Sequence, residues 1–307
     1  MQLPAAAAWA WIPIVIWAAF AQTIRNAAQR TLTASLGTLA ATLVRFLYGL
    51  PVAFAWVLLS YHLSGSDARM PPFGVRYALW LTVGATAQLA ATACLLAAMR
   101  ERNFIVGVTF SKTEVLQVGI FATLFLQEWP TLLSGLAMAV ATGGVVLLSL
   151  PKKGVPGAAQ WRGNAALFGL ASGAFFALSS VGYRGAALQL PGVSPWLVGA
   201  WAVLLAQLLQ TVLLGGWLVL RQPGTLTAVA KAWRLSSVAG AMGALASIGW
   251  LTALVLRPAV DVRTLGLVEV LFSYLVSRQL FRERMTRYEV LGLLLVGAGV
   301  LGVCAQL

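Results

Sequence analysis

The chain has little charge, few metal-binding residues and almost no cysteine. Only 9% of its 307 residues are charged, and it contains eight acidic residues, one histidine and two cysteines. Soluble globular domains carry about 25% charged residues, so this composition argues against a soluble protein. Cys94 and Cys304 each lie inside an apolar run and give neither a disulfide framework nor a metal-ligand spacing. The single His62 has no co-ligand cluster, and we expect no metal and no cofactor.

Long apolar runs fill most of the chain, and 60% of its residues are hydrophobic. Ten runs are near the length of about 20 residues that a helix needs to cross a bilayer. They cover residues 5–24, 36–61, 75–99, 103–127, 131–150, 164–187, 195–220, 234–256, 262–281 and 286–306. A spanning segment must satisfy its own backbone hydrogen bonds, as a helix does. The sequence predicts an all-α protein with ten transmembrane helices, a multi-pass protein of a bacterial-type inner membrane.

One stretch of the chain occurs twice, at an offset of 155 residues. Residues 114–145 and 269–300 align over 32 positions with 8 identities. The polar identities carry the signal, because the whole chain has so few acidic residues. They pair Glu114 with Glu269, Glu128 with Glu283, and Thr131 with Thr286. A duplication of this length is typical of secondary transporters.

The duplication divides the chain into two halves of five helices each. The expected first half is 1–150 and the second is 164–307, joined by a linker at 151–163 that is rich in Gly, Pro and Lys. Because five is odd, two halves of the same fold must enter the membrane in opposite senses. The prediction is an inverted-topology repeat.

Most of the Lys and Arg residues that give the net charge of +13 lie in the connections between the apolar runs. The connections after the odd-numbered runs carry 14 Lys and Arg residues, whereas those after the even-numbered runs carry 5. Such a bias is typical of the positive-inside rule. It places the odd-numbered connections in the cytoplasm and both chain ends outside. The basic balance therefore indicates a lipid bilayer as partner and argues against nucleic acid.

Charged residues inside the spans are the main functional signal, because a charge at the bilayer centre costs about 2.5–3.5 kcal/mol. Lys112 is expected near the midplane, with no acidic residue on its own helical face. We expect it to face a cavity and bind the anionic group of a substrate; the alternative is a structural lock between helices. Glu114 and Glu269 are candidates for proton coupling, and Glu269 is also a candidate ligand for a substrate amine. Their duplication fits a packing role equally well.

Other polar and aromatic residues complete the expected site. A small-molecule pocket combines apolar walls with a few polar groups. The candidates are Gln88, Trp17, Tyr183 and Trp250. Arg25, Arg45 and Arg184 are expected to snorkel to the membrane surface. Glycines in the last helix of each half favour internal packing, with a homodimer face as the alternative.

The junction motifs resemble those of a known family. They read Leu126-Gln-Glu-Trp-Pro-Thr131 with Gly135, and Phe281-Arg-Glu-Arg-Met-Thr286 with Gly292. With the helix count and Arg45, the chain resembles the EamA-like members of the drug/metabolite transporter superfamily. The resemblance implies a substrate cavity between helices 1, 3, 4, 6, 8 and 9, with a basic residue in helix 4 that Lys112 matches. It also implies cytoplasmic chain ends, against the charge bias.

The expected function is transport of small metabolites by alternating access, not enzymatic catalysis. The resemblance implies export of amino acids or related zwitterions. A carrier of lipophilic cations that uses Glu114 or Glu269 is the alternative, and Lys112 would hinder it. A membrane-embedded enzyme is a remote third reading, because the sequence offers no paired acids, histidine cluster or nucleophile arrangement.

Overall fold

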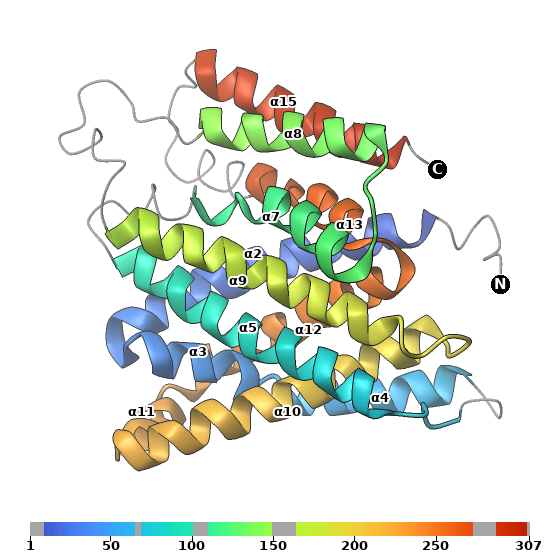
Figure 1. The fold of residues 1–307 in the computed structure, drawn as a ribbon. Helices are drawn as coiled ribbons and strands as arrows, with labels where there is room; N and C mark the ends of the chain where they lie inside the picture. Colours follow the sequence, from blue (N-terminus) through green and yellow to red (C-terminus); the bar gives the residue numbers. More distant parts are fainter. Residues whose placement is uncertain (1–8, 65–68, 101–109, 149–163, 273–286, 306–307) are drawn as a thin grey trace.

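The computed structural model describes residues 9–64, 69–100, 110–148, 164–272 and 287–305, and every regular element within them is a helix (Figure 1). In chain order the helices are α2 (Trp11–Leu36), α3 (Thr38–Leu47), α4 (Leu50–Ser64), α5 (Val75–Arg100), α7 (Glu114–Phe121), the π-helical η2 (Ala122–Leu126), α8 (Leu132–Leu148), α9 (Asn164–Ala187), α10 (Pro195–Arg221), α11 (Thr225–Lys231), α12 (Trp233–Leu256), α13 (Ala259–Gly266) and α15 (Arg287–Cys304). The expected linker 151–163 lies outside the described residues, as do Glu283 and Thr286.

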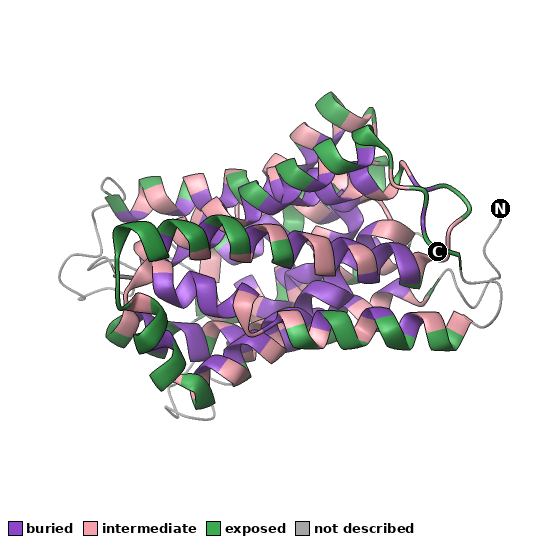
Figure 2. Ribbon diagram, turned by 90° about the horizontal axis from the view of Figure 1, so that it is seen from below, coloured by how far each residue is buried: buried purple, intermediate pink, exposed green. Residues whose placement is uncertain are grey.

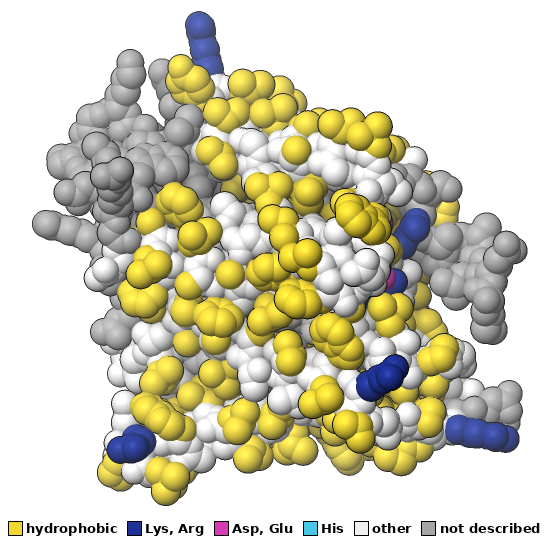
Figure 3. Space-filling view, viewed as in Figure 1, with side chains coloured by type: hydrophobic (Ala, Val, Ile, Leu, Met, Phe, Trp, Pro, Cys, Tyr) yellow, Lys and Arg dark blue, Asp and Glu magenta, His cyan; other side chains and the backbone are white. Residues whose placement is uncertain are grey.

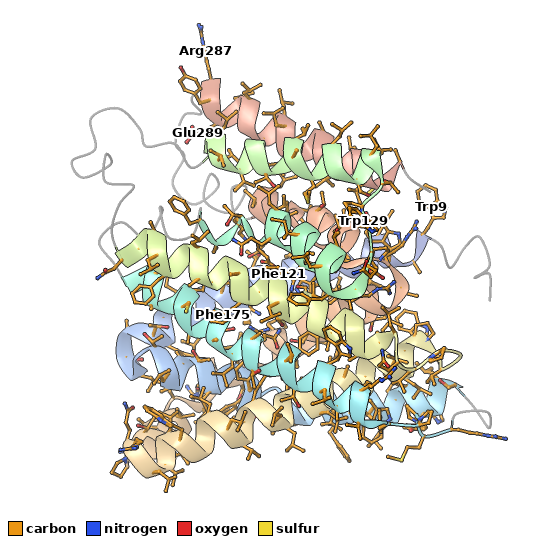
Figure 4. All side chains as sticks on the ribbon, viewed as in Figure 1. Trp9, Phe121, Trp129, Phe175, Arg287 and Glu289 are labelled. Carbon is orange, nitrogen blue, oxygen red and sulfur yellow. The ribbon has the colours of Figure 1, made fainter. Side chains whose placement is uncertain are left out.

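Within the described residues, six helices are long and apolar enough to cross a membrane. They are Thr38–Ser64, Val75–Ala98, Asn164–Ala187, Pro195–Arg221, Trp233–Leu256 and Arg287–Cys304, and two shorter apolar helices cover Glu114–Leu126 and Leu132–Leu148. Hydrophobic side chains dominate the face in Figure 3, with Lys and Arg mainly near its edges. Exposed Trp9 and Trp129 lie at one end of the bundle (Figure 4), where indole rings suit the boundary between lipid and water. The chain is a multi-pass membrane protein.

The helix boundaries agree closely with the expected runs for α5, α9, α10 and α12. The first helix is longer than expected: the run was expected to end at residue 24, but α2 continues to Leu36. Its polar second half includes Arg25 and Gln29, both buried against other helices. Polar residues were interpreted as the end of a span, whereas here they face the protein interior.

The helices pack in pairs that join the two halves of the chain. α5 runs along α9, α2 along α12, and α8 along α15, while α10 packs against α3 and α4. α7 contacts α9, α13 contacts α2, and α7 and α13 contact each other. Burial is concentrated between these pairs and exposure on the outer helix faces (Figure 2).

Small residues allow the closest of these contacts. A methyl group added to Gly144 of α8 would lie 2.7 Å from the carbonyl oxygen of Gly292 in α15, and one added to Gly299 would meet α8 similarly. These glycines therefore serve internal packing. Gly143 and Gly297 have open space instead, and whether they form a homodimer face stays a prediction.

The expectation that three arginines snorkel to the surface is wrong. Arg25 and Arg45 are 2% and 1% exposed, and Arg184 forms a half-buried ion pair. Arg263, which was counted among the loop residues, lies in α13 and is also ion-paired. Without Arg25 the odd connections carry 13 basic residues (14 − 1), and without Arg184 and Arg263 the even connections carry 3 (5 − 2). The charge bias is therefore stronger than the sequence count indicated.

Candidate functional site

Two helices contain a tight turn at the same position of the repeat, and the backbone of Thr113 and Leu267 stays in the right-handed helical region. A turn at Lys112 and Thr113 precedes α7, and Leu267 forms a turn directly after α13. Lys112 and Leu267 are 155 residues apart, which is the offset of the duplication. Each turn is closed by a backbone hydrogen bond to the carbonyl three residues earlier. Thr113 N–H donates to the Phe110 carbonyl at 3.2 Å, and Leu267 N–H donates to the Thr264 carbonyl at 3.1 Å. The turns bring the charged residues of both helices to one place.

Glu269 is the centre of this polar cluster. Its Oε2 accepts hydrogen bonds from Lys112 Nζ at 3.0 Å and from Gln22 Nε2 at 2.7 Å. Its Oε1 accepts one from Asn26 Nδ2 at 3.0 Å. Three donors, one of them charged, stabilise the carboxylate in the buried interior. Glu269 therefore joins α2 to the turn that precedes α7.

Glu114, the counterpart of Glu269, binds a different cation. Its Oε1 lies 3.1 Å from Nε of Arg263 in α13. The same Nε donates to Oγ of Ser180 at 2.7 Å, and the guanidinium lies 4.8 Å from the ring centre of Trp250. Lys112 with Glu269 and Arg263 with Glu114 are thus two crossed ion pairs. Each joins the helix 4 region to the helix 9 region.

A small cavity of about 30 Å³ lies among these groups. Its walls are formed by Gln22, Lys112, Glu114, Val115, Trp250, Arg263, Gly266, Leu267 and Glu269. This volume holds about one water molecule, so this cavity is too small for a metabolite in the conformation described here. Four of the predicted residues come together at this cavity: Lys112, Glu114, Glu269 and Trp250.

Gln88 and Tyr183 lie in a second polar cluster. Oε1 of Gln88 accepts hydrogen bonds from the Tyr183 hydroxyl at 2.8 Å and from Gln210 Nε2 at 2.9 Å, and all three residues are buried. The carbonyl of Gln88 accepts from the hydroxyl of Thr92, which in turn accepts from Arg45. The two residues bind each other, and neither lines the small cavity.

Trp17 is placed on the outside of the bundle. Its side chain is 47% exposed, and its ring centre lies 6.0 Å from that of Phe20. It does not line the cavity. Its role as a substrate wall stays a prediction that would need another conformation.

Lys112 was expected to face a cavity, with no acidic residue on its own helical face and a structural lock between helices as the alternative. It does line the cavity, but its ammonium group is already bound to Glu269 from the other half. The continuous helix from residue 103 on which the depth of Lys112 was based lies in part outside the described residues.

Three members of the cluster were not among the predicted site residues: Gln22, Asn26 and Arg263. Gln22 also accepts a hydrogen bond from Nε1 of Trp250 at 3.0 Å. The first two were interpreted as the polar end of a span. A signal was available for Arg263, because a basic residue six positions before a repeated Glu lies inside an apolar run.

Another cluster closes one end of the bundle. Arg184 of α9 binds Glu128 at 2.8 Å and donates to the carbonyls of Leu254 and Val255, at the end of α12, at 2.9 and 3.0 Å. Near this end, Ser134 donates to the buried Asp261 at 2.7 Å. One guanidinium therefore joins α9, α12 and the start of the α7–α8 connection.

The part of the chain that the structure describes holds no group of three His, Cys, Asp or Glu side chains arranged to bind a metal. The acidic groups at the cavity instead bind cationic side chains. The arrangement is suited to binding and releasing charged groups.

No protein-family model and no curated protein matches this chain. One solved structure, described only as the crystal structure of a protein, is 16% identical to it. The match has a TM-score of 0.66 and covers 98% of this chain and 96% of that chain. At this identity the similarity concerns the fold alone, over nearly the full length of both proteins.

Proposed function

We propose that the chain is a secondary transporter built from two five-helix inverted repeats, as in the drug/metabolite transporter superfamily that its motifs resemble. The helix contacts support the proposal. If helices are numbered 1–5 in one half and 6–10 in the other, the pair α5 with α9 is helix 3 with 6. Exchanging the two halves turns this pair into helix 8 with helix 1, which is the observed pair of α12 with α2. The same exchange leaves two other pairs unchanged: α8 with α15 (helices 5 and 10) and α3–α4 with α10 (helices 2 and 7).

The observation that carries the proposal is the pair of matching turns. Secondary transporters with inverted repeats place their substrate sites where helices are broken at corresponding positions of the two halves. Here both turns, at Lys112 and at Leu267, border the cavity that holds the two crossed ion pairs. Charges buried within a membrane bundle are costly and usually belong to a transport pathway.

The mechanism follows from the size and charge of the cavity. The small cavity holds water but no metabolite, so in this proposal a substrate reaches it when one half rocks against the other. This motion separates the helix 4 region from the helix 9 region and breaks the crossed ion pairs. A charged substrate then supplies replacement partners for Lys112, Glu269, Glu114 or Arg263. Substrate binding and pair rupture are thereby coupled, which is how alternating access avoids an open leak.

Such a site favours a small solute that carries both charges. An amino acid offers a carboxylate for a cation and an ammonium for a carboxylate, and Trp250 offers an apolar wall. Export of amino acids or related zwitterions from the cytoplasm is the function we propose. Glu114 and Glu269, freed from their partners in the open state, are the groups that would couple transport to protons.

Uptake into proteoliposomes tests the proposal. Purified protein is reconstituted, and the uptake of labelled amino acids is measured by counterflow. We expect Lys112→Met to lower the flux at least about tenfold, because the ion pair that responds to substrate is gone. Lys231→Met, an exposed lysine in α11, is the matched control and should keep wild-type flux.

Two outcomes would reject the proposal in different ways. Uptake of a lipophilic cation that increases in Lys112→Met would identify a cation carrier instead. A chemical change in a solute, without its movement across the membrane, would identify an enzyme.

A further inference from the structure

Two buried arginines lie side by side in the bundle. Arg25 of α2 is 2% exposed and Arg45 of α3 is 1% exposed. A methyl group added to Gly243 of α12 would lie 3.0 Å from Cγ of Arg45 and 3.3 Å from Cδ of Arg25. Both side chains therefore cross the same point of α12, and Gly243 leaves room for them.

Neither arginine has a carboxylate partner among the described residues. Arg25 donates from Nη2 to Oδ1 of Asn26 at 2.7 Å, and Arg45 donates from Nη1 to the Thr92 hydroxyl at 2.9 Å. Nε and Nη1 of Arg25 and Nε of Arg45 are buried without an acceptor in the described part of the chain. A guanidinium stays protonated in proteins, and buried charged donors without partners are strongly disfavoured.

The charge balance of the interior points the same way. Lys112 is matched by Glu269, and Arg263 is matched by Glu114. Among the residues that the structure describes, Arg25 and Arg45 therefore leave an excess of two positive charges in this part of the bundle. Like charges repel strongly where the dielectric constant is low, and a bound anion would relieve both the repulsion and the missing acceptors.

The arginine pair connects the two polar clusters described above. Asn26, the acceptor for Arg25, donates to Glu269 at the small cavity. Thr92, the acceptor for Arg45, donates to the carbonyl of Gln88 in the second cluster. A ligand on the arginines would therefore be in contact with both clusters through one hydrogen-bonded chain.

Building on the proposed transport function, we propose that Arg25 and Arg45 bind the anionic group of the substrate. The N–H groups without an acceptor, Nε and Nη1 of Arg25 and Nε of Arg45, could each donate a charge-assisted hydrogen bond to an oxygen of a carboxylate or a phosphate group. The substrate class is then a small organic anion, such as an acidic amino acid or a phosphate monoester. Lys112 would act in the closing ion pair and would not be the main ligand of the anion.

Ligand-dependent thermal unfolding of the purified protein tests this site. Glutamate, glycerol 3-phosphate, leucine and lysine are compared at equal ionic strength. We expect glutamate or glycerol 3-phosphate to raise the Tm by several degrees, because a ligand of the folded state stabilises it. Leucine and lysine, which carry one carboxylate and no net negative charge, should raise the Tm less. A response to glutamate alone assigns a carboxylate, and a response to glycerol 3-phosphate alone assigns a phosphate.

Arginine variants then locate the anion. In Arg25→Gln/Arg45→Gln the affinity should fall at least about 100-fold, since charge-assisted hydrogen bonds are roughly twice as strong as neutral ones. Arg221→Gln, an exposed arginine at the end of α10, should retain the wild-type response. An unchanged response in the double variant, equal stabilisation by leucine or lysine, or no response of the wild type to either anion would overturn the proposal.

A conservative pair covers the case in which the double Gln variant does not fold. Arg25→Lys/Arg45→Lys keeps both charges but loses the planar forks, so we expect folding with about tenfold weaker anion binding. Unchanged affinity there overturns the site. Uptake separates this inference from the proposed function. If the protein binds anions but takes up no solute, the anion site is supported and the transport function is rejected. If leucine uptake is equal in the wild type and the double variant, the transport function is supported and the anion site is rejected.

Discussion

Lys112 Nζ lies 3.0 Å from Glu269 Oε2, so the charge that the sequence analysis left without a partner is bound to the second copy of the repeated glutamate. The contact joins residues 157 positions apart. Breaking a buried pair by removing one partner typically costs about 3–5 kcal/mol, because the other charge is left unpaired. Lys112→Met should therefore lower the thermal stability as well as the flux.

A double variant separates the two effects. In Lys112→Met/Glu269→Gln no charge is left unpaired, so most of the lost stability should return while transport stays low. Thermal unfolding in detergent measures the first quantity, and counterflow measures the second. Lys231→Met again serves as control. A double variant that is less stable than Lys112→Met alone would contradict this account of the pair.

Arg184 should act as a closure at one end of the bundle. The substitution Arg184→Gln removes the ion pair with Glu128 and the hydrogen bonds to two carbonyls of α12 at once. It should therefore open that end of the bundle to water. The measurement is the rate at which an impermeant thiol reagent labels Val260→Cys, 2% exposed in the closed form, in a protein without Cys94 and Cys304.

We expect labelling of Val260→Cys to become several times faster in Arg184→Gln. Arg221→Gln, which removes an exposed arginine, should leave the rate unchanged. Equal rates in all three proteins would show that Arg184 stabilises the structure without controlling access.

Two adjacent glycines provide a sharp test of the α8–α15 contact. A methyl group on Gly144 would lie 2.7 Å from the backbone oxygen of Gly292, whereas one on Gly143 meets nothing within 4 Å. Overpacking a tight contact costs about 1–3 kcal/mol. Gly144→Ala should therefore lower the Tm clearly.

Gly143→Ala is the matched control and should leave the monomer Tm unchanged. Should it instead dissociate a dimer, as seen by size-exclusion chromatography with light scattering, the homodimer alternative would gain support. Equal destabilisation by both variants would contradict the packing described for α8 and α15.

The sequence predicted the parts of this fold that depend on local patterns. Apolar run length located α5, α9, α10 and α12 within a few residues, and the duplicated Glu114 and Glu269 both border the small cavity. Their partners could not be predicted, because pairing across 157 residues depends on packing that no local pattern encodes. Arg25 and Arg45 were misplaced for a related reason: a basic residue near a span end has the same local pattern whether it reaches the surface or turns inward.

The buried arginines make the predicted orientation of the molecule in the membrane sharper. Once Arg25, Arg184 and Arg263 are set aside as interior residues, the bias towards the odd-numbered connections is 13 to 3. The positive-inside rule then places the connection at Gly154 in the cytoplasm and the one at Ser66 outside, and both positions lie outside the described residues. In intact cells, a membrane-impermeant thiol reagent should label Ser66→Cys and leave Gly154→Cys unmodified until the cells are permeabilised, with the native cysteines removed in both. The reverse pattern would favour the cytoplasmic chain ends that the family resemblance implies, and it would show that the loop charges do not set the direction of this protein.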